Sequence, residues 1–155
     1  MPVRDSTDLR IIHELQNNAR LSNKELAARV GVAPSTCLER MKWLTSSGVF
    51  HGFHADIHPD ALGVGLQAML SVQLSVHAFE QIEEFRERIL GLPEVSALYH
   101  VAGANDFMIH VAVRDSDHLR NLVMASFTSL PVVRHIETAL VFEHTRKPVS
   151  AMLAR

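Results

Sequence analysis

The stretch RLSNKELAARVGVAPSTCLERMKWLTSSG, residues 20–48, decides how the first third of the chain folds. Ser22 and Glu25 form a capping box, because each side chain can bond a free backbone amide at the start of a helix, and Gly31 ends that helix. Pro34 suits the first turn of a second helix. Apolar side chains recur along this second helix at helical spacing: Cys37, Met41 and Leu44. Two helices joined by a tight, glycine-containing turn predict a helix-turn-helix, whose second helix enters the major groove of DNA.

The charge of this stretch also favours DNA binding. Between residues 20 and 42 there are five basic residues and two acidic ones, although the whole chain has a net charge of −2. Short hydroxyls and cations on an exposed helix face can reach phosphates and base edges. We therefore predict that eight residues contact DNA: Arg20, Lys24, Pro34, Ser35, Thr36, Glu39, Arg40 and Lys42. Two alternatives stay open: the charges only solvate a helix face, or the helices contact another protein, and such a contact would persist at high salt.

The residues on either side of this stretch complete a helical domain and a linker. A further helix is predicted before residue 18 by apolar residues at helical spacing: Leu9, Ile12 and Leu15. We assign residues 1–48 to a helix-turn-helix DNA-binding domain. Residues 49–58 alternate as a short strand would, and Pro59 and two glycines interrupt the pattern after residue 58. This predicts a linker strand and hinge over residues 49–65.

Residues 66–145 have the periodicities of four strands and two helices. Their order is strand, helix, strand, strand, helix, strand, which is the split βαβ pattern of a ferredoxin-like domain. We therefore expect an α+β chain with an N-terminal helix-turn-helix domain, a ferredoxin-like βαββαβ domain and a C-terminal tail, residues 146–155. Two helices cover one face of such a sheet, so the other face is free to pack against a second subunit.

Composition excludes several classes of protein. The 155 residues, of which 47% are hydrophobic, suit one domain or two small ones with a large buried surface. The one cysteine, Cys37, cannot form an intrachain disulfide, and the polar start is unlike a signal peptide, so we expect a cytoplasmic location. Polar residues such as Gln67 interrupt the longest uncharged run, which argues against a membrane span. No catalytic or phosphate-binding motif is present, so we predict no enzymatic activity and no cofactor.

Ten histidines raise the question of a metal site. His54, Asp56 and His58 would share one face of the predicted linker strand, and all three residue types bind divalent metals. Three ligands on one face leave a four-coordinate site incomplete, and scattered imidazoles are more often surface or interface residues. We predict no metal site here.

The run from residue 7 to residue 63 resembles the DNA-binding half of the leucine-responsive and asparagine-responsive (Lrp/AsnC) regulators. The residues that carry this resemblance include Leu15, Asn18, Arg20, Glu25, Leu26, Ala27, Pro34, Ser35, Thr36, Arg40, Leu44 and Gly48. The segments VAGANDFMIHVAV and LPVVRHIETALVFEHTRKP resemble the effector-sensing domain of the same family. The resemblance covers roughly residues 7 to 148. Ala33 and Glu39 depart from it, since a serine cap and a second arginine are frequent at these positions.

The resemblance implies a homodimer, often assembled into tetramers or octamers, that binds double-stranded operator DNA and responds to a small effector, commonly an amino acid. It also implies an effector site with five members: Gly103, Ala104, Asn105, Asp106 and Thr138. Asp106 would hold the ammonium group of the amino acid, beside a glycine-containing loop that offers backbone amides. The alternative is that residues 103–106 form an ordinary hairpin turn. Departures from the family at Ala102, Asn105 and Ile136 leave the identity of the effector open.

Overall fold

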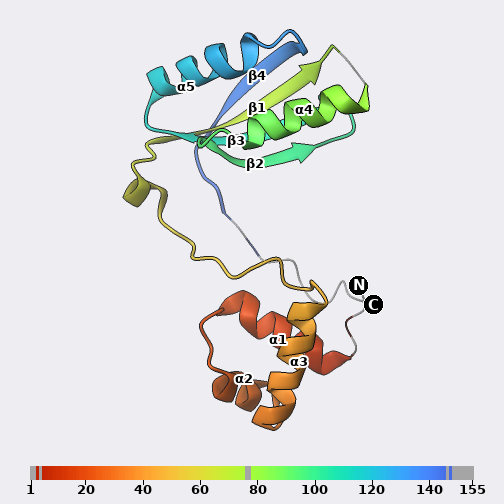
Figure 1. The fold of residues 1–155 in the computed structure, drawn as a ribbon. Helices are drawn as coiled ribbons and strands as arrows, with labels where there is room; N and C mark the ends of the chain where they lie inside the picture. The colour runs from red at the N-terminus through yellow and green to blue at the C-terminus, as the bar shows by residue number, and fades with distance from the viewer. Residues whose placement is uncertain (1–2, 4, 76–77, 146, 148–155) are drawn as a thin grey trace. The chain divides into compact units, whose positions relative to one another are not determined.

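The computed structural model describes Val3, residues 5–75 and 78–145, and Lys147. The chain divides into two compact units, with the boundary between Ala55 and Asp56, inside the predicted linker. The first unit contains three helices: α1 (Ser6–Asn17), α2 (Asn23–Val30) and α3 (Pro34–Ser46) (Figure 1). The helical expectations for the first third of the chain are therefore confirmed.

Local sequence explains where these helices begin and end. The Ser22–Glu25 capping box is formed at the start of α2, and Gly31 ends that helix in the left-handed region, with φ of 72°. Ala33 gives α3 no side-chain cap. The side chain of Asn23 instead joins the starts of α2 and α3, because its Nδ2 donates to the Pro34 carbonyl at 2.8 Å.

Apolar side chains from all three helices form the core of the helical unit. Its buried members are Ile11, Leu15, Leu26, Ala27, Val30, Cys37 and Leu44. Burial of this apolar area is the main force that stabilises the unit. Burial also raises the pKa of the Cys37 thiol, since the thiolate would lose its hydration.

The predicted linker strand is wrong. Residues 49–58 form no strand in the described part of the chain, and a short 3₁₀ helix, η1 (Pro59–Leu62), follows them. Alternating polarity is not sufficient for a strand, because the backbone of a strand must also bond to a neighbouring one. No described strand of this chain pairs with this segment.

The second unit is a four-stranded antiparallel sheet with two helices. Its elements follow the predicted order: β1 (Leu66–Leu74), α4 (Phe79–Leu90), β2 (Val95–His100), β3 (Phe107–Val113), α5 (Ser116–Val123) with the π-helical turn η2 (Met124–Thr128), and β4 (Val133–Val141). The strands lie in the order β2-β3-β1-β4, so the first and third strands are central. This arrangement confirms the ferredoxin-like α+β fold (Figure 1).

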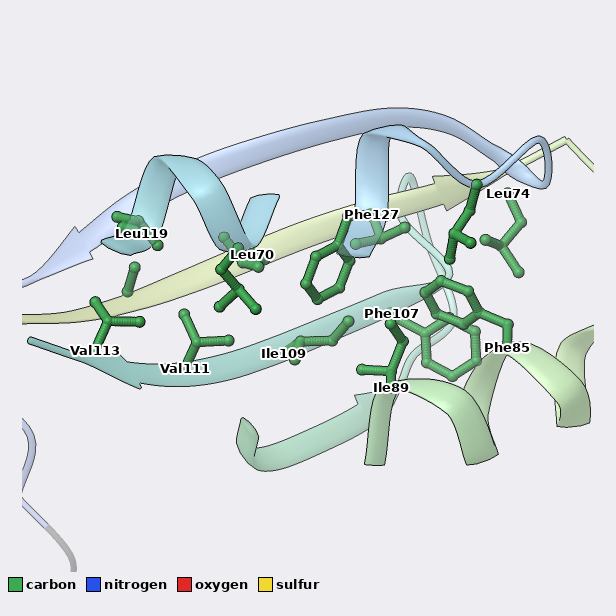
Figure 2. Close-up of a cluster of buried hydrophobic side chains, with 14 residues drawn as sticks. Leu70, Leu74, Phe85, Ile89, Phe107, Ile109, Val111, Val113, Leu119 and Phe127 are labelled. Carbon is green, nitrogen blue, oxygen red and sulfur yellow. The ribbon is translucent and has the colours of Figure 1, made fainter. Parts of the chain in front are cut away.

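The two faces of this sheet are different. Alternate side chains of β1 and β3, such as Leu70 and Ile109, are fully buried against Phe85 of α4 and Phe127 of η2 (Figure 2). The intervening β1 side chains point to the other face and are only half-buried: Gln67, Met69, Ser71 and Gln73. Among the described residues, no helix packs against this second face, which we call the open face. None of the described helices is long and apolar enough to cross a membrane.

Candidate nucleic-acid interface and effector loop

The first turns of α3 present a row of exposed side chains. The exposed members are four of the predicted DNA contacts, Pro34, Ser35, Thr36 and Glu39, and Lys42 lies exposed one turn further along. The opposite side of α3 is held in the core by Cys37 and Leu44, so the direction of this row is fixed. Such a row offers hydroxyls, a carboxylate and an ammonium group to a groove.

Two further predicted cations lie outside α3. Lys24 is exposed in the first turn of α2, and Arg20 is exposed in the turn that precedes it. The backbone amide of Arg20 donates to Asn18 Oδ1 at 3.0 Å, which fixes the chain where this cation emerges. Both residues have exposed side chains of the type that bonds phosphates.

Arg40 has a different environment from the other predicted contacts. Its Nη1 lies 2.7 Å from Asp8 Oδ1 and 2.9 Å from Asp5 Oδ1, and its Nη2 lies 2.8 Å from Asp5 Oδ2. The hydrogen bonds that the guanidinium donates to Asp5 and then to Asp8 raise its pKa, and the bond from Arg40 is the main cause that lowers the pKa of Asp5. We call these three residues the Arg40 cluster.

The two acidic members of this cluster, Asp5 and Asp8, are not among the residues predicted from the sequence. Asp8 is fully buried, although carboxylates are almost never buried without a partner. It lies one turn before Ile11 and two turns before Leu15, on the apolar stripe of α1. A charged residue within an apolar stripe was the available signal that a cation from elsewhere in the chain would pair with it.

The predicted effector loop, residues 103–106, connects β2 and β3. Gly103 and Ala104 are exposed, and the φ of Gly103 is +145°, a conformation that favours glycine. Asp106 is bonded to β1, because its Oδ2 accepts from the Leu74 amide at 2.7 Å. Gln73 Nε2 donates to Asn105 Oδ1 at 3.4 Å, which is a weak bond. The loop is thus attached along one edge and exposed at its tip.

Thr138 does not lie with this loop in the chain. It pairs with Leu70 across β1 and β4, and directly opposed side chains share a face of the sheet. Leu70 points into the core beneath the helices, whereas Asn105 bonds Gln73, which is on the open face. Within one subunit the structure therefore brings together residues 103–106 but not Thr138.

The open face contains a buried histidine that was not predicted from the sequence as a site residue. His110 of β3 is 9% exposed, its Nδ1 lies 2.6 Å from Ser96 Oγ, and its Nε2 has no hydrogen-bond partner among the described residues. The ring of His144 lies 5.3 Å from the His110 ring. Burial, and then the neighbouring His144, lower the pKa of His110.

The three residues weighed as metal ligands, His54, Asp56 and His58, are exposed. His58 Nδ1 lies 3.6 Å from Asp60 Oδ2. In the part of the chain that the structure describes, no three side chains of the histidine, cysteine, aspartate or glutamate type come together as a metal site.

Comparisons with known proteins agree with this two-unit architecture. The winged helix-turn-helix DNA-binding family matches residues 4–50, and the Lrp/AsnC ligand binding domain family matches residues 67–149. The HTH-type transcriptional regulator AldR of Mycolicibacterium smegmatis is 44% identical over 142 residues, which cover 92% of this chain and 83% of AldR. The leucine-responsive regulatory protein of Haemophilus influenzae is 32% identical over 143 residues, covering 92% of this chain and 86% of that protein.

A solved structure extends the likeness to the fold. The crystal structure of a transcriptional regulator in complex with L-Met, from Neisseria meningitidis, has a TM-score of 0.87 and 29% identity, with 96% of each chain covered. The relatives are transcriptional regulators, which confirms the prediction that the function is not enzymatic. The family matches span both units, and the chain therefore belongs to the Lrp/AsnC family of DNA-binding transcriptional regulators.

Proposed function

We propose that this regulator binds operator DNA through the first turns of α3. Ser35, Thr36 and Glu39 face the base edges of a major groove, and Lys42, with Lys24 from α2, bonds the phosphates on either side. The observation that carries the proposal is the exposed row on α3. The opposite side of the helix is buried in the core, which fixes the direction in which this row points. Glu39 would select cytosine, since its carboxylate accepts from the N4 amino group of that base. The matches to DNA-binding relatives favour this assignment over a protein contact by the same helices.

We further propose that the second unit senses an amino acid at the loop of residues 103–106. The exposed backbone around Gly103 suits a carboxylate, and the Asp106 carboxylate suits an ammonium group. The L-Met complex of the Neisseria meningitidis regulator supports an amino acid as the class of effector. Thr138 remains a candidate only if a second subunit supplies it, because it lies apart from the loop within one chain.

The open face of the sheet is the proposed dimer interface, and further association of dimers would give tetramers or octamers in the cytoplasm. Half-buried Met69 of β1 and Met108 of β3 lie on this face, where Met69 pairs with His110 and Met108 pairs with Ser71. Tyr99 of β2 pairs with Met108 and is 54% exposed. Apolar and aromatic side chains at such a surface are typical of an interface between subunits.

Duplex binding tests the proposal. The full chain is titrated against the DNA fragment upstream of its own coding sequence and against a scrambled duplex, at two salt concentrations, with and without a pool of L-amino acids. We expect preference for the upstream fragment, weaker binding at the higher salt and a change of affinity with the pool. Equal affinity for both duplexes would contradict operator recognition, and no change with the pool would contradict amino-acid sensing.

A further inference from the structure

We propose that Arg40 is a positioning residue, which fixes α3 against the start of α1 and does not contact DNA. This inference rests on the proposed binding of DNA by α3. It differs from the expectation drawn from the sequence, in which Arg40 bonds phosphates or bases. The Arg40 cluster, composed of Arg40, Asp5 and Asp8, carries the argument.

Both Nη atoms of the Arg40 guanidinium are engaged in hydrogen bonds within the cluster. Asp5 accepts from both Nη atoms, at 2.9 and 2.8 Å, and Asp8 accepts from Nη1 at 2.7 Å. Distances of this kind are typical of strong, charge-assisted hydrogen bonds, and the two-oxygen contact with Asp5 fixes the plane of the guanidinium. Only 24% of the Arg40 side chain is exposed.

Charge within the cluster also opposes a phosphate contact. Two carboxylates face one guanidinium, so the cluster as a whole does not attract an anion. The Asp8 side chain is fully buried, and if Arg40 turned toward DNA this carboxylate would lose the 2.7 Å bond from Arg40 in a place that water does not reach. Lys24 and Lys42 are exposed and carry no comparable penalty.

The same cluster connects two helices that shape the DNA-binding surface. Asp5 caps α1, since its Oδ1 accepts from the amides of Thr7 at 2.8 Å and Asp8 at 3.1 Å. Arg40 lies one turn after Thr36 on α3. The Asp5 carboxylate therefore caps α1 and also holds α3 at the turn next to the exposed row. A substitution of Asp5 should shift the exposed row, although Asp5 itself does not contact DNA.

Asp5→Asn is the deciding variant, because asparagine caps helices as well as aspartate does and the fold should persist. Its matched control is Glu14→Gln, which removes one carboxylate that pairs with Arg29 at 3.0 Å and so corrects for the loss of negative charge. Affinity for the upstream duplex is measured by fluorescence anisotropy with the full chain. Positioning predicts that Asp5→Asn binds roughly two- to tenfold more weakly than Glu14→Gln. Affinity equal to or above that of the control would overturn the proposal, since a phosphate-binding Arg40 would gain from the release.

The salt dependence of binding gives a second readout. Log affinity falls as log salt concentration rises, and removal of one phosphate contact reduces the magnitude of this slope by about one. Removal of a positioning residue lowers the affinity and leaves the slope unchanged. We expect an unchanged slope for Arg40→Ala and a reduced slope for Lys42→Ala. A reduced slope for Arg40→Ala would also overturn the proposal. If Arg40→Ala does not fold, which circular dichroism will show, Asp5→Asn decides alone. Failure of the unaltered chain to prefer the upstream duplex would instead refute the proposed function.

Discussion

Asp106→Ala tests whether the proposed effector loop depends on a single carboxylate for its attachment to the sheet. In the structure Asp106 Oδ2 accepts from the Leu74 amide at 2.7 Å, and the Asp106 amide donates to the Val72 carbonyl at 2.9 Å. The substitution keeps the second bond and leaves the part-buried Leu74 amide without its charged acceptor. Loss of such an acceptor costs about 1–3 kcal/mol of unfolding free energy. For a domain of this size, each kcal/mol lowers the unfolding midpoint by roughly 4–8 °C.

Thermal unfolding at one fixed protein concentration measures this effect, since association shifts the midpoint. Asp106→Asn keeps an oxygen that can accept from Leu74 but loses the charge, so we expect about half the loss of Asp106→Ala. Asn105→Ala is the matched control in the same loop. It removes only the weak 3.4 Å contact with Gln73, and its midpoint should stay close to that of the unaltered protein.

The Asn variant also separates the two roles of Asp106. A residue that only attaches the loop should keep its response to the amino-acid pool in Asp106→Asn, because the attachment survives. A residue that binds the ammonium group of the effector should lose the response in the same variant, because the negative charge is gone. An unaltered midpoint for Asp106→Ala would refute the reasoning that the Leu74 bond attaches the loop.

Buried groups and helix caps give three further predictions. The pKa of His110 in the folded protein is below its ordinary value of 6.5, so the unfolded chain takes up the proton at a higher pH than the folded protein does. Neutral His110 therefore contributes fully to the free energy of unfolding above pH 6.5, and this contribution is lost as the pH falls toward the folded-state pKa. His110→Gln should therefore flatten the decrease in unfolding free energy between about pH 7.5 and about pH 5.5, measured by urea titration. Cys37 is buried with a raised pKa, so a thiol reagent should modify it in urea and leave the native protein unmodified for much longer. Ser22→Ala removes both the acceptor for the Glu25 amide and one partner of the Glu25 carboxylate, and should cost about 1 kcal/mol by chemical denaturation. Ser22→Thr, which keeps the hydroxyl as acceptor and donor, should cost less.

Hydrophobic periodicity, together with the residues that begin and end helices, was sufficient to predict most elements of both units. The capping box at Ser22, the glycine at 31 and the proline at 34 act within one turn of the chain, so their effects can be read locally. Alternation along β1 predicted this strand for the same reason, since every second side chain meets the core. The segment after α3 was misread because its alternation has no neighbouring strand to bond.

The environments of the candidate site residues could not be read in this way. Arg40 and Asp8 are 32 residues apart, and no local pattern shows that they meet. Likewise, a turn at residues 103–106 could be predicted from its residue types, but the bond between Asp106 and β1 depends on how strands distant in sequence pair. The sequence alone thus identifies which side chains have the chemistry to bind DNA or an effector. The fold determines which of these side chains are engaged in ion pairs or hydrogen bonds within the chain.

The burial of Asp8 restricts how this sequence can change during evolution. Substitution of Arg40 alone would remove the 2.7 Å ion pair of the fully buried Asp8 carboxylate, which is strongly destabilising, whereas substitution of Asp8 alone leaves Arg40 paired with Asp5. Replacement of both by apolar side chains of similar volume avoids that penalty. Loss of Arg40 is therefore expected only together with loss of Asp8 or after it, whereas Asp5, which is 44% exposed, can accept asparagine as an intermediate. The burial of one carboxylate thus constrains the order in which positions 8 and 40 can change.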